Sequence, residues 1–151
     1  MTAEIFQLDA GDAWDLIFPE FLATLDPIQQ ETMRRTIGNS SHTWAGAQDG
    51  KIVAFWGLIP PSLLSDRAYL WMFHTPHLQE HVFIFIRHSQ RVVQDALGLY
   101  PILCGHALVD NTRAIRWLRW LGADFGEPIQ GKLLPFEIRA EKWQRQQVQS
   151  A

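Results

Sequence analysis

The feature that most constrains the fold of this chain is a β-hairpin signal in its first half. Two runs with strand character, Thr43–Gln48 and Lys51–Leu58, are separated only by the dipeptide Asp49-Gly50. An Asp-Gly turn tolerates the positive φ angles that a two-residue hairpin connection demands. The sequence therefore predicts two antiparallel strands joined at this turn, and the pair Pro60-Pro61 ends the second strand.

Strand and helix patterns on both sides of the hairpin define the rest of the fold. Apolar and β-branched runs predict further strands at Glu4–Leu8, Ala68–Phe73, Ile102–Val109, Ala123–Phe125 and Leu133–Arg139. Helical spacing predicts helices at Gly11–Leu25, at Pro27–Gly38, from His77 or Leu78 to Leu97, and from Asp110 or Asn111 to Gly122. The order β-α-α-β-β-β-α-β-α-β-β predicts an α/β fold with a mixed central sheet and helices on both faces.

Several helix boundaries follow from capping residues. Asp26 is predicted to cap the second helix, with Pro27 in its first position and Gln29 completing a capping box. Gly38 and Gly98 are predicted to end the second and third helices.

Length and composition exclude several classes of protein. With 151 residues, 47% of them apolar, and a net charge of −3, the chain is not collagen-like, disordered or strongly basic. We predict one domain over residues 1–140 and a frayed polar tail over residues 141–151. Cys104 is the only cysteine, so an intramolecular disulfide is impossible.

The longest apolar stretch, Ile52–Pro61, is far short of the ~20 residues that span a bilayer, and the acidic N-terminus is unlike a signal peptide. A cytoplasmic protein without a membrane segment is therefore predicted.

Three stretches together resemble the GNAT superfamily of acetyl-CoA-dependent N-acetyltransferases. Ala45–Ala54 resembles the hairpin of the family's second and third strands. Asn111–Ile115, followed by Leu121-Gly122 and Phe125, resembles the helix after the fifth strand. Phe73–Ile84 stands where the cofactor loop follows the fourth strand in that family. The resemblance covers nearly the whole chain and implies the GNAT fold.

The resemblance also implies a donor, an acceptor and a binding site. Acetyl-CoA would be the cofactor, and the acetyl group would pass directly to a primary amine of a small molecule or peptide. In the family, N–H groups at a helix start hold the CoA pyrophosphate, and the splayed fourth and fifth strands take the pantetheine arm. The donor-binding residues so implied are Met72, Phe73, His74, Gln79, Glu80, His81, Val82, Phe83, Ile84 and Asn111.

The chain departs from the family pattern at three positions. Gln79 fits the first position of the Q/R-x-x-G-x-G/A signature, but Val82 and Ile84 occupy its glycine positions. Leu118 occupies the position of the usual acid, a tyrosine, so no general acid is assigned. These departures leave open an inactive GNAT-fold protein that acts in assembly or partner binding. With its Trp- and Arg-rich helix Arg113–Leu121, the chain also resembles small, degenerate GNAT-like proteins of tailed phages, some associated with virion assembly.

Two histidines are candidates for the general base. His74 ends the fourth predicted strand, and His106 lies midway along the fifth. A neutral imidazole on either strand would be able to deprotonate an amine. The alternative for each is a histidine hydrogen-bonded in the sheet or at its edge, which is the commoner case.

Three further patterns have a structural interpretation beside the functional one. His77–His81 spells H-x-x-E-H, an inverted zinc-protease motif, but without a third ligand we predict no metal site. Arg113, Arg116 and Arg119 repeat every three residues, and the acidic net charge favours a solvated helix face over a nucleic-acid surface. Cys104, in an apolar strand, is predicted to be an inert thiol.

The tryptophans and acidic residues give the last expectations. Trp44, Trp56 and Trp71 are predicted in the core, whereas Trp14 and Trp143 are candidate contact anchors for a homo-oligomer or protein partner. Acceptor specificity is expected from the loops over residues 16–37 and 60–67. Acidic residues that would suit a cationic amine are Asp12, Asp15, Glu20, Asp26, Glu31 and Asp66.

Overall fold

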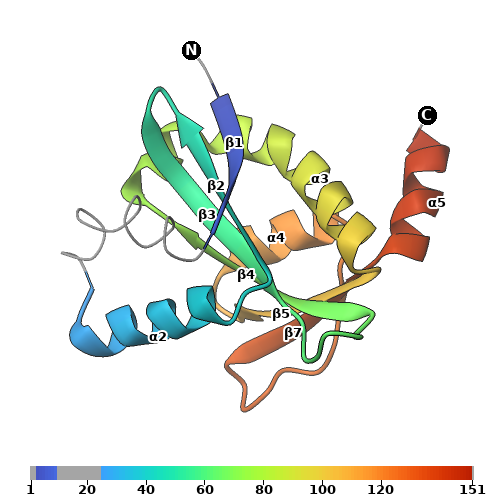
Figure 1. Cartoon of the computed structure of the whole chain (residues 1–151). Coiled ribbons are helices and arrows are strands. Elements are labelled where there is room, and N and C mark those ends of the chain that lie inside the picture. The colour runs from blue at the N-terminus through green and yellow to red at the C-terminus, as the bar shows by residue number, and fades with distance from the viewer. Residues whose placement is uncertain (1–2, 10–24, 151) are drawn as a thin grey trace. The chain divides into compact units, whose positions relative to one another are not determined.

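A computed structural model describes residues 3–9 and 25–150, which form a mixed α/β fold with a seven-stranded sheet (Figure 1). The strands are β1 (Ala3–Leu8), β2 (His42–Gln48), β3 (Lys51–Ile59), β4 (Arg67–His74), β5 (Ile102–Leu108), β6 (Asp124–Phe125) and β7 (Leu133–Arg139). The helices are α2 (Pro27–Gly38), the short 3-10 helix η1 (Pro76–Glu80), α3 (Val82–Leu99), α4 (Thr112–Trp120) and α5 (Ala140–Ser150). The strand order is β1-β2-β3-β4-β5-β7-β6, and every predicted strand is present.

The chain divides into two compact units. Unit 1 comprises Met1–Pro60 and Leu70–Phe85, and unit 2 comprises Pro61–Tyr69 and Ile86–Ala151. Strand β4 and helix α3 therefore contribute residues to both units. The single domain over residues 1–140 stays a prediction.

The hairpin of unit 1 forms as the sequence predicts. β1 pairs antiparallel with β2, β2 pairs antiparallel with β3, and the three strands lie side by side in Figure 1. Asp49 and Gly50 adopt φ angles of 53° and 80°, the left-handed values that this tight connection requires. A register shift between Gly46 and Ala47 marks a bulge in β2.

Helix α2 begins with the predicted capping box. The Asp26 side chain accepts a hydrogen bond from the Gln29 N–H at 2.8 Å, and the Gln29 side-chain oxygen accepts one from the Asp26 N–H at 3.1 Å. The helix ends at Gly38 as predicted, but its C-cap is Asn39, whose φ is −89°. The end of α2 therefore does not depend on a left-handed glycine.

Strand β3 supplies much of the core of unit 1. Every residue from Val53 to Leu58 is buried, as expected of a strand covered on both faces. The predicted core residues Trp56 and Trp71 are 5% and 6% exposed, and the Trp71 indole N–H donates to the Ser40 hydroxyl at 2.8 Å. Trp44 is only half-buried.

The predicted start of the third helix, at His77 or Leu78, is wrong. These residues form η1, because the Thr75 side chain caps that turn by accepting a hydrogen bond from the His77 N–H. His81 follows with a φ of −132°, which interrupts the helical path, and α3 begins only at Val82.

The predicted end of the same helix is wrong as well. Gly98 lies inside α3, which continues to Leu99. The glycines with positive φ are Gly50, Gly122 and Gly131, so Gly98 does not adopt the left-handed conformation that ends many helices.

The strands of unit 2 are joined differently. β5 pairs antiparallel with β7 over its whole length, and β7 pairs antiparallel with β6. Within unit 2, β4 pairs parallel with β5 where Arg67–Tyr69 lies opposite Ile102–Cys104. Both strands continue past this pairing, β4 to His74 and β5 to Leu108.

Helices α4 and α5 follow the strands of unit 2. Asn111 caps α4 by accepting a hydrogen bond from the Ala114 N–H at 3.1 Å, which confirms one of the two predicted caps. Gly122, with a φ of 89°, follows the helix. Most of the predicted polar tail belongs to α5. Trp143 on this helix is 6% exposed, so the prediction that it is a contact anchor is wrong.

Some predictions lie outside the described residues. They are the helix at residues 11–25 with its kink at Pro19, the anchor Trp14, and the acidic residues Asp12, Asp15 and Glu20. Of the helices that are described, none combines the length and the apolar character needed to cross a membrane.

Close packing around Gly57 gives a test of the fold. A Cβ at this position would lie 2.5 Å from the Trp71 ring and 2.7 Å from the His42 carbonyl oxygen. Because a backbone oxygen in a sheet cannot move aside freely, Gly57→Ala should destabilise the protein by roughly 1–3 kcal/mol. Urea unfolding followed by tryptophan fluorescence measures this loss.

Gly98→Ala is the matched control. A Cβ at Gly98 would meet nothing within 4 Å, and the position is helical. This substitution should raise the free energy of unfolding by about 0.5–1 kcal/mol. A Gly57→Ala protein as stable as the parent would contradict the packing described.

Candidate active site

Unit 2 contains an open hollow beside its sheet. Its volume is about 330 Å³, which is within the range of small-molecule sites. Strands β4, β5, β6 and β7 all contribute to its wall. The lining residues are Tyr69, Cys104, Gly105, His106, Asp124, Phe125, Gly126, Pro135, Phe136 and Glu137.

Alternation along β5 decides which of its side chains reach the open face. Leu103, Gly105 and Ala107 are buried, whereas Cys104 is half-buried and His106 is exposed. Successive side chains of a strand point to opposite faces of the sheet. Cys104 and His106 therefore share the open face.

Cross-strand register places further side chains in a row with Cys104. Tyr69 on β4 lies opposite Cys104, Cys104 lies opposite Glu137 on β7, and Glu137 lies opposite Asp124 on β6. This row crosses the sheet of unit 2. His106 stands two residues further along β5, on the same face as Cys104.

Tyr69 and His106 form the contact with the clearest acid–base chemistry. The His106 Nδ1 lies 3.4 Å from the Tyr69 hydroxyl oxygen, and the ring centroids are 5.7 Å apart. Burial raises the pKa of the Tyr69 hydroxyl, and the charge of an ionised Cys104 would raise it further. At neutral pH Tyr69 is therefore a protonated hydroxyl that can donate to a base.

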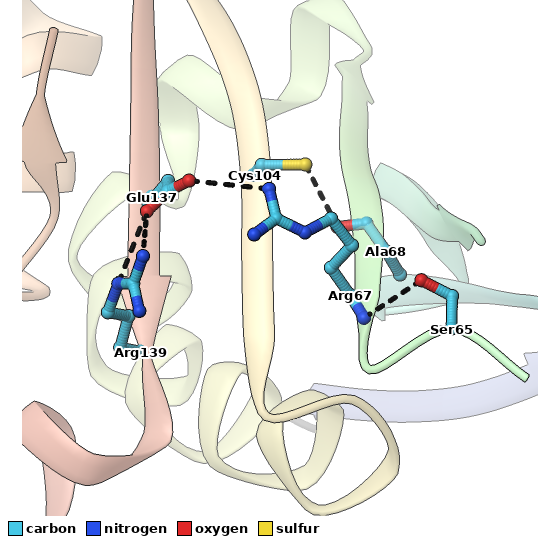
Figure 2. A network of polar contacts seen from close by, with 6 residues as sticks. All are labelled: Ser65, Arg67, Ala68, Cys104, Glu137 and Arg139. Atoms are coloured by element: carbon cyan, nitrogen blue, oxygen red, sulfur yellow. Dashed lines mark hydrogen bonds and ion pairs between the residues drawn. The ribbon is translucent and has the colours of Figure 1, made fainter. Parts of the chain in front are cut away.

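Glu137, which lines the hollow, is joined to Arg139 and Arg67 in the network of Figure 2. The Nε and Nη2 atoms of Arg139 both donate to Oε2 of Glu137, at 3.2 and 2.8 Å. The Nη1 atom of Arg67 lies 3.5 Å from the other oxygen, Oε1, which is long beside the roughly 2.8 Å of a charge-assisted hydrogen bond. Glu137 is thus anchored by Arg139 and only loosely joined to Arg67.

Cys104 is a thiol at neutral pH, but it is half-buried rather than fully buried and has a cation nearby, unlike the buried cysteine that the sequence predicts. Burial raises the pKa of its thiol, the Arg67 guanidinium lowers it and Glu137 raises it, with burial the largest of the three. Figure 2 shows the Arg67 guanidinium beside Cys104, with one nitrogen joined to Glu137. The Cys104 Sγ also contacts the Ala68 carbonyl oxygen at 3.6 Å.

Residues 72–74, predicted to bind the donor, end strand β4 in unit 1. The next residue, Thr75, is buried. Its hydroxyl donates to the Ile52 carbonyl at 2.6 Å, and its N–H donates to the Val53 carbonyl at 2.9 Å. These bonds fix the strand end against β3. His74 is exposed, and its Nδ1 lies 3.4 Å from the Thr75 carbonyl oxygen.

The remaining predicted donor loop forms η1 and the first turn of α3. Gln79 and Glu80 end η1, and His81 is its C-cap. Within the described residues, the N–H groups of residues 82–84 have no hydrogen-bond partner, because the bonding of α3 starts with the Phe85 N–H on the His81 carbonyl. Phe83 is 89% exposed, whereas its neighbours at the signature's glycine positions, Val82 and Ile84, are half-buried.

The H-x-x-E-H motif does not form a zinc-binding helix face. His77 lies in η1 and His81 caps it, so the two imidazoles are not one turn apart on an α-helix. The His81 Nε2 instead lies 3.9 Å from a carboxylate oxygen of Glu80. Across residues 3–9 and 25–150, no three His, Cys, Asp or Glu side chains are grouped to hold a metal ion.

Helix α4 carries the other predicted positions. The side-chain oxygen of Asn111 is used as the helix cap. Leu118, at the position of the family's tyrosine, is 4% exposed and belongs to the core of unit 2. Arg113 and Arg116 are exposed, and the Arg119 guanidinium lies 5.6 Å from the centre of the Phe125 ring.

The sequence did not point to Tyr69 and Glu137, which line the hollow, or to Arg67, which contacts Glu137. The available signal was weak. Arg67 and Tyr69 are two residues apart on a predicted strand, which places them on one face. The sequence does not say which face stays open, nor which β7 residue lies opposite Cys104.

Comparisons with known proteins concern the fold. Neither a family model nor a curated protein sequence matches this chain. A chimera of the spermidine N-acetyltransferase SpeG from Vibrio cholerae with hSSAT matches in structure with a TM-score of 0.66 and 15% identity, covering 95% of this chain and 99% of that chain. An IAA acetyltransferase from Bacillus cereus matches with a TM-score of 0.69 and 11% identity, over 91% and 99% of the two chains.

A third similar structure, assigned to the GNAT acetyltransferases, comes from Desulfovibrio desulfuricans. Its TM-score is 0.69 at 12% identity, over 92% of this chain and 99% of that chain. At such identities the likeness shows the fold alone, and the fold is that of the GNAT acyl-CoA N-acyltransferases, as predicted. The predicted likeness to phage proteins has no support in these structures.

Alkylation of Cys104 reports the electrostatics of the hollow, because the chain has no other cysteine. The pKa of this thiol is raised above its ordinary value of 9.0, mainly by burial. Since the thiolate is the reacting form, the rate of iodoacetamide labelling should rise with pH to a midpoint above 9.0. Intact-mass spectrometry of quenched samples measures the rate.

Arg67→Gln should move this midpoint to still higher pH, because the guanidinium favours the thiolate. Arg116→Gln, which removes an exposed arginine of α4, should leave the midpoint where it is. An unchanged midpoint in Arg67→Gln would show that Arg67 does not lie beside Cys104.

Proposed function

We propose that this chain is an N-acetyltransferase that passes an acetyl group from acetyl-CoA to a primary amine. The observation that carries the proposal is the 3.4 Å contact between His106 and Tyr69 in the wall of the hollow. Acyl transfer to an amine needs a base for the amine proton and an acid for the leaving thiolate. This pair supplies both, on a fold shared with proteins named as N-acetyltransferases.

The first turn of α3 supports binding of the CoA phosphates through its backbone. Unpaired N–H groups at a helix start attract anions, and those of residues 82–84 have no partner among the described residues. We therefore assign the pyrophosphate to these N–H groups, beside Gln79, Glu80 and His81.

We assign the acetyl thioester of the donor to the last residues of β4. Residues Leu70–His74 form the last part of β4, in unit 1. A backbone N–H group there would polarise the carbonyl of the acetyl group. When bound, acetyl-CoA supplies this group as a thioester.

His106 acts as the base in this proposal. In the tautomer whose Nδ1–H donates to the Tyr69 oxygen, Nε2 keeps its lone pair. Nε2 takes the proton that the acceptor amine loses as its nitrogen bonds to the acetyl carbon. We assign this role to His106 rather than His74 because His106 has the phenol partner.

Tyr69 acts as the acid that the family's helix position lacks. Its raised pKa keeps the hydroxyl protonated until it gives its proton to the departing sulfur. The Nδ1 proton of the His106 imidazolium then passes to the Tyr69 oxygen. The exposed imidazole regains its starting tautomer by proton exchange with water.

His106→Gln and Tyr69→Phe test this assignment. Each should lower kcat by roughly 10²–10⁴-fold, because general acid–base catalysis contributes about that much. The KM for acetyl-CoA should change little, since neither side chain is assigned to donor binding. Mass spectrometry of the acetylated product, with saturating acetyl-CoA and a panel of primary amines, measures the rates.

His88→Gln is the control, because His88 is a half-buried histidine of α3 that lines no part of the hollow. Its kcat should equal that of the parent. Full activity in both His106→Gln and Tyr69→Phe would refute the assigned acid and base. Absence of acetylation across the whole panel would favour an inactive GNAT-fold protein.

A further inference from the structure

We propose that the hollow of unit 2 takes a zwitterionic α-amino acid as the acetyl acceptor. This inference rests on the proposed function and narrows its substrate class to amines with a carboxylate close by. The feature that points to it is the loose ion pair between Glu137, which lines the hollow, and Arg67, which contacts Glu137 from outside the lining (Figure 2).

Among the described residues, most hydrogen-bond donors of the Arg67 guanidinium have no partner. Among the described residues, its side chain makes one polar contact, the 3.5 Å approach of Nη1 to Glu137 Oε1, and 42% of that side chain is exposed. A guanidinium carries five N–H donors in a planar fork that matches a carboxylate. The remaining N–H donors of Arg67 can therefore bind a ligand carboxylate.

Glu137 offers the opposite charge beside it. Arg139 holds Oε2 through two hydrogen bonds, so the carboxylate is fixed in place, while among the described residues Oε1 has the long contact with Arg67 alone. An α-amino acid carries its ammonium and carboxylate two bonds apart. Its two charges can each meet the opposite member of an ion pair whose atoms are 3.5 Å apart.

The charge balance disfavours a polycationic acceptor. Two carboxylates line the hollow, Glu137 and Asp124, and three cations contact them: Arg67, Arg139 and Lys142. Positive charge is thus in excess. The prediction of a cationic amine rests on acidic residues that include Asp26, Glu31 and Asp66. None of these three lines the hollow.

The other lining residues favour a particular side chain on the acceptor, and the position of His106 determines whether the base contacts the acceptor's amine. Tyr69, Phe125, Pro135 and Phe136 offer apolar surface that suits an aromatic side chain. Glu137 is the diagonal neighbour of His106 across β5 and β7, a spacing of roughly 7–8 Å that long and aromatic side chains bridge. An amine bound between these two side chains can contact both.

Binding of three matched ligands tests the inference without turnover. L-phenylalanine has both charges, phenethylamine lacks the carboxylate and phenylpropanoate lacks the amine. Isothermal titration should show L-phenylalanine binding at least about tenfold more tightly than either, because each lost charge removes a charge-assisted hydrogen bond. Equal or tighter binding of phenethylamine would overturn the inference.

The variant Arg67→Gln tests whether the guanidinium binds the ligand carboxylate. It should weaken L-phenylalanine binding by about tenfold or more and leave phenethylamine binding unchanged. The control Arg116→Gln, which removes an exposed arginine outside the hollow, should change neither. An Arg67→Gln protein that still prefers the amino acid would show that Arg67 does not hold the carboxylate.

Acetylation assays separate this inference from the proposed function. With acetyl-CoA, N-acetyl-L-phenylalanine should form at a higher kcat/KM than acetylated phenethylamine or spermidine. Faster acetylation of spermidine would overturn the inference and leave the acetyltransferase intact. Selective binding of the amino acid without any acetyl transfer would overturn the proposed function and leave the binding site intact.

Discussion

The two-residue period of β5 is the constraint on which the candidate site depends. Leu103, Gly105 and Ala107 are buried, which leaves Cys104 and His106 on the opposite, open face. A shift of one residue in the register would bury His106 and expose the core. The pairings of β5 with β4 and β7 then fix Tyr69 and Glu137 on either side of Cys104. Both the acid–base pair and the charged border follow from this alternation.

The same arrangement joins the proposed chemistry to substrate choice. Tyr69 and Arg67 are two residues apart on β4, so one strand places the acid near His106 and the guanidinium near Glu137. Arg139 holds Oε2 of Glu137, so a substrate ammonium would meet the other carboxylate oxygen, Oε1. In this proposal, acid–base chemistry and charge selection lie on neighbouring positions of one sheet face, so substitutions at Arg67 would change acceptor preference without removing the base.

Local signals predicted most of the fold, and tertiary packing decided what they missed. The Asp49-Gly50 turn and the Asp26 capping box depend on adjacent residues, and both are present. The start of α3 was missed because Thr75, held by β3, caps a separate turn first. The role of His106, a candidate base because of its strand, stays a prediction. The sequence did not point to Tyr69, because its place beside His106 depends on cross-strand register, which the sequence does not display.

Titration of acetyl-CoA into the full chain, with the heat measured and free CoA as the comparison, tests whether this protein uses acetyl-CoA. We expect micromolar binding, about −8 kcal/mol, through the backbone of the α3 start despite the missing glycines. Free CoA should bind with similar affinity, because the phosphates and pantetheine arm make most of the contacts. No heat at millimolar acetyl-CoA would mean that the chain does not bind the donor, and its GNAT fold would then serve something other than acetyl transfer.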